Sequence, residues 1–95
     1  MQIPKKVKVG AETYIVEIVD RIDPTKSEED DWAGLTEHNT LNIKVRRGKQ
    51  EAMEHTFLHE LLHTFNGAIH DERLVESLST GLHSFIKDNP KVFNK

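Results

Sequence analysis

The sequence predicts an α+β domain in which a mostly antiparallel sheet is followed by two packed helices. Strand-like alternation lies within the first 46 residues, whereas apolar residues recur at helical spacing in two later segments. The chain of 95 residues has room for one core and two layers, but not for a second domain. We therefore expect a single domain over residues 1–95, with strands within about 5–46 and helices at about 49–66 and 72–87.

The first two strands are expected to form a hairpin. Residues 6–9 alternate between lysine and valine, residues 10–12 supply a turn, and residues 13–19 are rich in β-branched side chains.

The segments that follow the hairpin predict a loop and two further strands. Residues 20–31 are polar and include a proline and an acidic run, which is typical of a loop. A short strand is expected at residues 32–36 and a turn at 37–39. Residues 40–46 alternate again, with their apolar side chains on one face.

Two helices are expected in the second half of the chain. The first covers residues 49–66 and ends at Gly67, which suits a helix C-terminus. Asp71 is a suitable N-cap for the second, which covers residues 72–87 and is ended by Asn89-Pro90. The apolar residues that recur at helical spacing in the second helix are Leu74, Val75, Leu78, Leu82, Phe85 and Ile86.

Composition narrows the classes of function. Thirteen basic and 16 acidic residues give a net charge of −3, which does not favour nucleic-acid binding. There is no cysteine, so any zinc site must use histidine and carboxylate ligands. The sequence shows no secretory h-region and no run of the roughly 20 apolar residues that a membrane helix requires, so we expect a cytoplasmic protein without a membrane segment.

The most informative motif is His59-Glu60-Leu61-Leu62-His63, an H-E-x-x-H pattern within the first expected helix. Residues four apart lie on one face of a helix, so His59 and His63 can hold one Zn²⁺ between them. Glu60 then lies beside the metal, where it can act as the general base toward a bound water. These five residues indicate metallohydrolase chemistry.

The third metal ligand is expected on the second helix. If the two helices run antiparallel around a turn near Ala68, the midpoint of the two histidines lies opposite Glu76. A carboxylate at this core-facing position has no apolar role, so we predict Glu76 as the third ligand. Glu72, one turn earlier, is the rival; if it binds the metal, Glu76 can accept a hydrogen bond from a ligand imidazole.

The chain resembles the zinc metallopeptidases of the gluzincin type. More narrowly, it resembles small proteins of the ImmA/IrrE metallopeptidase group and their phage-encoded relatives. The resemblance is carried by residues 56–63 (TFLHELLH) and 72–78 (ERLVESL), with a phage-like ending at residues 81–82 and 88–90, and it covers roughly residues 40–90.

The resemblance implies a minimal zincin-like fold and a zinc site made by His59, His63 and a glutamate of the second helix, with Glu60 as the catalytic base. The third ligand of the family maps best onto Glu76, although the two residues that follow it depart from the family pattern. The resemblance does not include the family's DNA-binding or regulatory extensions, so we expect no such role from it.

Two functions follow as hypotheses. The first is a zinc-dependent metallopeptidase that hydrolyses a peptide bond in a peptide or protein substrate. The alternative is a metallopeptidase-like binding or regulatory module, in which zinc is structural and no hydrolysis occurs. The simplest interpretation is a metal-free pair of packed helices, in which hydrogen bonds satisfy the buried histidines.

Two further segments are relevant to the expected site. Tyr14 is a candidate donor to the oxyanion of a tetrahedral intermediate, although packing at the sheet edge is the simpler role. The strand at residues 40–46 leads directly into the motif helix. If it forms an exposed edge, a peptide can add to it as an extra strand.

Overall fold

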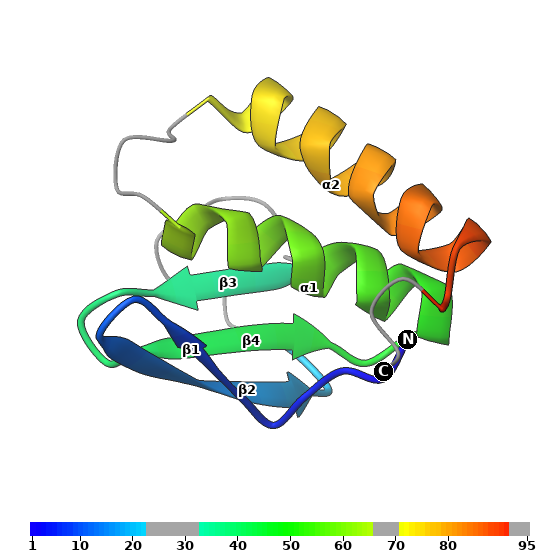
Figure 1. Cartoon of the computed structure of the whole chain (residues 1–95). Helices are drawn as coiled ribbons and strands as arrows, with labels where there is room; N and C mark the ends of the chain where they lie inside the picture. Colours follow the sequence, from blue (N-terminus) through cyan, green and yellow to red (C-terminus); the bar gives the residue numbers. More distant parts are fainter. Residues whose placement is uncertain (23–32, 66–70, 92–95) are drawn as a thin grey trace.

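The computed structural model describes residues 1–22, 33–65 and 71–91, and these form a four-stranded sheet followed by two helices. The elements in chain order are β1 (Lys6–Val9), β2 (Glu12–Val19), β3 (Gly34–Glu37), β4 (Asn42–Arg46), α1 (Gln50–Phe65) and α2 (Glu72–Asp88). In Figure 1 α1 lies on one face of the sheet and α2 packs on α1. The predicted α+β fold is confirmed.

The strand order is β1-β2-β4-β3, and both outer pairs are antiparallel while β2 and β4 pair in parallel. The prediction of a mostly antiparallel sheet is therefore confirmed, with a parallel pair at its centre. The hypothesis that residues 40–46 form an exposed edge is wrong, because β4 lies between β2 and β3 and is paired on both sides. Among the described strands, the edge that lies beside α1 is β3.

The turn of the first hairpin depends on Gly10. Val9 pairs with Glu12, so Gly10 and Ala11 form a two-residue connection, and Gly10 has a φ of 62°. A positive φ at the first central position is typical of a type II′ turn, which matches the twist of the strands that it joins. Glycine adopts this conformation without the steric cost that a Cβ would bring.

The core lies between the sheet and α1. Alternate residues of β2 and β4 point toward the helix, as the period of two requires, and α1 contributes residues from its facing side. The buried core residues of these three elements are Tyr14, Val16, Ile43, Val45, Phe57 and Leu58.

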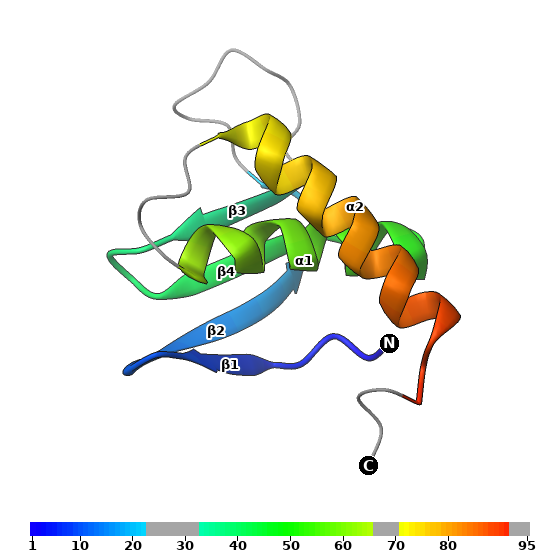
Figure 2. The same ribbon diagram turned by 45° about the horizontal axis from the view of Figure 1, so that its top comes forward.

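The second helix is positioned by its cap and by its inner face. The carboxylate of Asp71 accepts hydrogen bonds from the backbone N–H groups of Arg73 and Leu74, so the predicted N-cap is confirmed. Val75 and Ser79 are fully buried against α1. Figure 2 shows α2 crossing α1 on the side away from the sheet, which brings the start of α2 over the second half of α1.

Some predicted features lie outside the described residues. These are the acidic run and Trp32 of the expected loop and short strand, and Gly67 in the connection between the helices. Within the part of the chain that the structure describes, neither helix is long and apolar enough to cross a bilayer.

Candidate metal centre

Three histidines of α1 face α2 at intervals of four residues. His55, His59 and His63 lie on one side of the helix because 3.6 residues complete each turn. Opposite them, Glu72 and Glu76 lie four residues apart on the facing side of α2. The result is an alternating row of imidazoles and carboxylates between the two helices.

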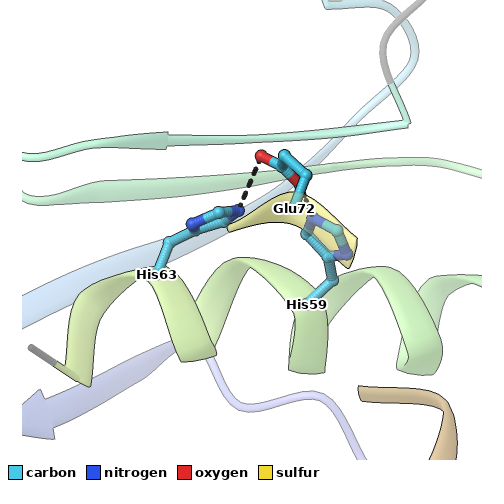
Figure 3. Close-up of side chains that lie close together, drawn as sticks. All are labelled: His59, His63 and Glu72. Carbon is cyan, nitrogen blue, oxygen red and sulfur yellow. Dashed lines mark hydrogen bonds and ion pairs between the residues drawn. The ribbon is translucent and has the colours of Figure 1, made fainter. Parts of the chain in front are cut away.

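His59, His63 and Glu72 converge on one point. In Figure 3 both imidazoles reach from α1 toward the carboxylate of Glu72. The Nε2 atom of His59 lies 3.0 Å from Oε2 of Glu72, and Nε2 of His63 lies 3.2 Å from Oε1. One ligand atom from each of the three residues lies within 4.8 Å of the others. The two short distances involve different oxygens of Glu72, and ligands about 2.0–2.1 Å from a tetrahedral zinc lie roughly 3.3 Å apart. The three residues are therefore close enough to form a candidate metal site.

Glu76 lies on the other side of the His59 ring. Its Oε1 atom is 3.2 Å from Nδ1 of His59 and 3.1 Å from Nε2 of His55. A carboxylate that accepts the Nδ1–H hydrogen bond leaves Nε2 of His59 free to bind a metal, and this is the usual arrangement around ligand histidines. The arrangement therefore favours Glu72, the rival of the sequence analysis, as the third ligand in place of the predicted Glu76.

The environment of Glu76 favours its charged form. Partial desolvation acts to raise the pKa of Glu76, but the hydrogen bond with His59 and the charges of His55 and His59 outweigh it. The hydroxyl of Ser79 contributes a further hydrogen bond, and the net effect is a lowered pKa. An ionised Glu76 can accept a hydrogen bond from a proton-bearing imidazole nitrogen.

Glu60 is buried beside this group, with only 8% of its surface exposed. The hydroxyl of Thr36 in β3 donates to Oε1 of Glu60 at 2.8 Å and also lies 3.0 Å from the Glu60 backbone oxygen. Burial raises the pKa of the Glu60 carboxyl, against the opposing effects of the Thr36 hydrogen bond and of His59 and His63. A buried carboxyl whose proton affinity is increased in this way is suited to general base chemistry.

A cavity of about 670 Å³ joins these groups to the edge of the sheet. One wall is β3 with the residue before it, and the other is formed by the facing sides of α1 and α2. The cavity therefore contains the three candidate ligands, Glu60 and a strand edge in one continuous space. Its charged and titratable lining residues are His38, His55, His59, Glu60, His63, Glu72 and Glu76.

Tyr14 does not border this cavity directly. Its side chain is buried in the core, and its hydroxyl lies 3.2 Å from Nδ1 of His38, which does line the cavity. Burial raises the pKa of Tyr14, so its hydroxyl stays protonated and can donate to His38. Tyr14 therefore has a packing role, but it packs in the core from the inner strand β2 and not, as predicted, at the sheet edge. His38 is the residue that lines the cavity.

Thr36 and Gly34 were not identified as site residues by the sequence analysis. Their only signal is a glycine and a threonine two residues apart in an expected strand, which is common in strands without a site. The contact with Glu60 depends on how β3 lies against α1, and local sequence patterns do not contain that information.

A second polar cluster lies farther along the same helix pair. The buried carboxylate of Glu54 lies 3.0 Å from Nε2 of His83, 2.9 Å from Nε2 of Gln50 and 3.2 Å from the amino group of Met1. His83 therefore interacts with Glu54 and is not among the residues that line the cavity.

No protein-family model, curated protein or solved structure matches this chain.

Proposed function

We propose that this protein is a zinc-dependent metallopeptidase, in which His59, His63 and Glu72 bind the metal and Glu60 is the general base. The observation that carries the proposal is the convergence of these ligand atoms within 4.8 Å, next to a buried carboxylate in the same cavity.

The donor set fits a hydrolytic zinc ion. Two imidazoles and one carboxylate are a common ligand set of catalytic zinc, and three protein ligands leave a fourth position for water or substrate. When bound, zinc supplies a water of lowered pKa and polarises the carbonyl of the scissile bond.

The residues of the chain then have separate roles. Glu60 accepts a proton from the attacking water and delivers it to the leaving amine. Glu76 holds the Nδ1–H of His59, which fixes the orientation of that imidazole. His38 and His55 line the cavity and can donate hydrogen bonds to a polar substrate.

The strand β3 offers a place for an extended peptide. It pairs with β4 along one side, and its residues also line the cavity that holds Glu60 and the ligand group. A peptide that adds to such an edge is held by main-chain hydrogen bonds, which peptides of many different sequences can form. A peptide bond is therefore the substrate class that we propose.

The substitution Glu60→Gln tests the proposal. The variant should keep one zinc per chain, because the ligands are unchanged, and should lose at least about 100-fold in the rate of peptide cleavage. Zinc content is measured by metal analysis, and cleavage by mass spectrometry of a mixed peptide library. Glu17→Gln, an exposed change in β2, is the matched control and should leave both values unchanged. Unchanged cleavage by the Glu60→Gln protein would refute the mechanism.

A binding module with a structural zinc is the second candidate. The observation behind it is the exposure of the Glu72 side chain, 69% of which is accessible, because a site open on that side encloses a bound peptide poorly. In this case the wild-type protein binds zinc but cleaves no peptide in the library, and Glu60→Gln changes neither property.

A further inference from the structure

The strand β3 contacts α1 at the candidate general base. Thr36 is the residue that makes this contact, and its hydroxyl reaches both the side chain and the backbone carbonyl of Glu60, at 2.8 and 3.0 Å. Among the described residues, Thr36 is the one that donates a hydrogen bond to the Glu60 carboxylate. One hydroxyl therefore joins the sheet edge to the carboxylate.

Gly34 allows this approach. A Cβ added at Gly34 would lie 2.6 Å from Cγ2 of Thr56, 2.9 Å from Cγ of Glu60 and 3.1 Å from Oε2 of Glu60. A side chain at this position would require the Thr56 side chain, the Glu60 side chain or α1 itself to move. Gly34 and Thr36 are two residues apart, so they face α1 from the same side of the strand.

Gly34 and Thr36 lie against different oxygens of the Glu60 carboxylate. Thr36 donates to Oε1, whereas Oε2 lies over Gly34 and is not covered by a side chain there. Both residues line the cavity that contains the ligand group. One oxygen of Glu60 is therefore held by a hydrogen bond while the other is kept clear.

We propose that Thr36 is a positioning residue that fixes the Glu60 carboxylate for proton transfer, and that Gly34 keeps its second oxygen accessible. This inference rests on the proposed role of Glu60 as the general base. A glutamate side chain has three rotatable torsions, and holding it in one conformation removes an entropic cost from the reactive geometry. The hydrogen bond is thus part of the catalytic arrangement, beyond its role in joining β3 to α1.

The kinetic test compares Thr36→Val with Thr36→Ser. Valine has nearly the same shape but cannot donate, so kcat should fall roughly 10- to 100-fold while KM for a cleaved peptide and zinc content stay near the wild-type values. Serine restores the donor and should restore most of kcat. Equal kcat in the valine variant and the wild type would overturn the proposal, as would a serine variant that is as slow as the valine variant.

A second measurement does not depend on activity. In the zinc-loaded protein, three-bond NMR couplings that report χ1 of Glu60 should show one rotamer in the wild type and in Thr36→Ser, and averaging among rotamers in Thr36→Val. A single unchanged rotamer in the valine variant would overturn the proposal. If the wild type cleaves no peptide, the proposed function fails, while this measurement still decides whether Thr36 positions Glu60.

Gly34→Ala provides an independent variant if Thr36→Val does not fold. The added methyl should displace the Glu60 carboxylate and lower kcat at least 10-fold, with zinc still bound. Gly48→Ala is the matched control, because a Cβ at Gly48 meets nothing within 4 Å and should leave kcat unchanged. A Gly34→Ala protein with wild-type kcat would contradict the role given to this glycine.

Discussion

At the scale of single residues, two glutamates one turn apart on α2 have different surroundings. Glu72 places its two oxygens against the Nε2 atoms of His59 and His63, whereas Glu76 lies against Nδ1 of His59 and against His55. A metal ligand and a group that orients a ligand are expected to differ strongly in their contribution to metal affinity.

Substitution of each glutamate separates these roles. Glu76→Gln should weaken zinc binding by about 10- to 100-fold, as is typical when the partner of a ligand histidine is changed. Glu72→Gln should weaken it by more than that, because one of three protein ligands is lost. Zinc affinity is measured by competition with a coloured chelator. The reverse order of the two effects would restore Glu76 as the ligand.

The sequence alone could not make this choice. The motif fixed His59, Glu60 and His63 on one helix, because their spacing matches the helical repeat. The choice between Glu72 and Glu76 depends on the register between two helices, and a one-turn shift of α2 along α1 would bring Glu76 to the position that Glu72 occupies. Neither periodicity nor capping determines that register.

At the scale of elements, α1 and α2 are joined by polar contacts at both ends of their interface. The row of imidazoles and carboxylates at the candidate metal centre occupies one end, and the Glu54 cluster with His83 occupies the other. Between them Val75 and Ser79 are fully buried, and the Ser79 hydroxyl finds partners in His55 and the Glu76 carbonyl. Titratable side chains therefore form part of this interface, and its stability should depend on pH.

Glu54→Gln tests this dependence. Desolvation opposes ionisation of Glu54, but the bonds from His83, Gln50 and the amino group of Met1 outweigh it and lower its pKa below the ordinary 4.5. A carboxylate whose pKa is lower in the folded than in the unfolded chain stabilises the fold when the pH is above its unfolded pKa. This stabilisation is lost as the pH falls through the folded pKa. At neutral pH the substitution should cost roughly 1–3 kcal/mol in the free energy of unfolding.

The acid range provides the check on that prediction. The difference between wild type and Glu54→Gln should narrow as the pH falls below about 4.5, where the carboxylate becomes protonated. Urea titrations at a series of pH values measure both curves. Glu51→Gln, which removes an exposed pair with Lys87 on the same helices, should have a much smaller effect. If the free energies of unfolding of wild type and Glu54→Gln differed by the same amount at every pH, ionised Glu54 would not be the source of the pH dependence.

At the scale of the whole molecule, the proposed zinc site joins α1 to α2 through side chains from both. A ligand that binds only the folded chain stabilises it by about 2.7 kcal/mol at 100 times its dissociation constant. For a domain of this size that corresponds to a rise in Tm of roughly 10–20 °C. Chelation should remove the rise, and His63→Ala should show none.

His38→Ala is the control for the thermal measurement. His38 lines the same cavity but does not belong to the candidate ligand group, so the variant should keep the zinc-dependent rise in Tm. Equal melting of the wild type with and without zinc would argue against a metal site in the folded protein.

The fold as a whole was predictable where local patterns determine it. The hairpin, both helices and the Asp71 cap follow from spacing and residue type, and the structure confirms them. The position of β4 was not predictable, because strand 40–46 has the same alternation whether it pairs on one side or on two. The contact of Thr36 with Glu60 depends on that sheet order, since β3 reaches the edge beside α1 only when β4 is central.

The parallel pairing of β2 with β4 also bears on how the chain folds. The β1–β2 hairpin needs only neighbouring residues, but Val16 must find Ile43 across a long intervening segment before the sheet can close. Such distant pairings slow folding because chain entropy is lost before the contacts form. During synthesis the β1–β2 hairpin can form early, whereas the complete sheet can form only after β4 has been synthesised. Because α1 begins four residues after β4 ends, the helix that carries the motif emerges directly after the strand that completes the sheet.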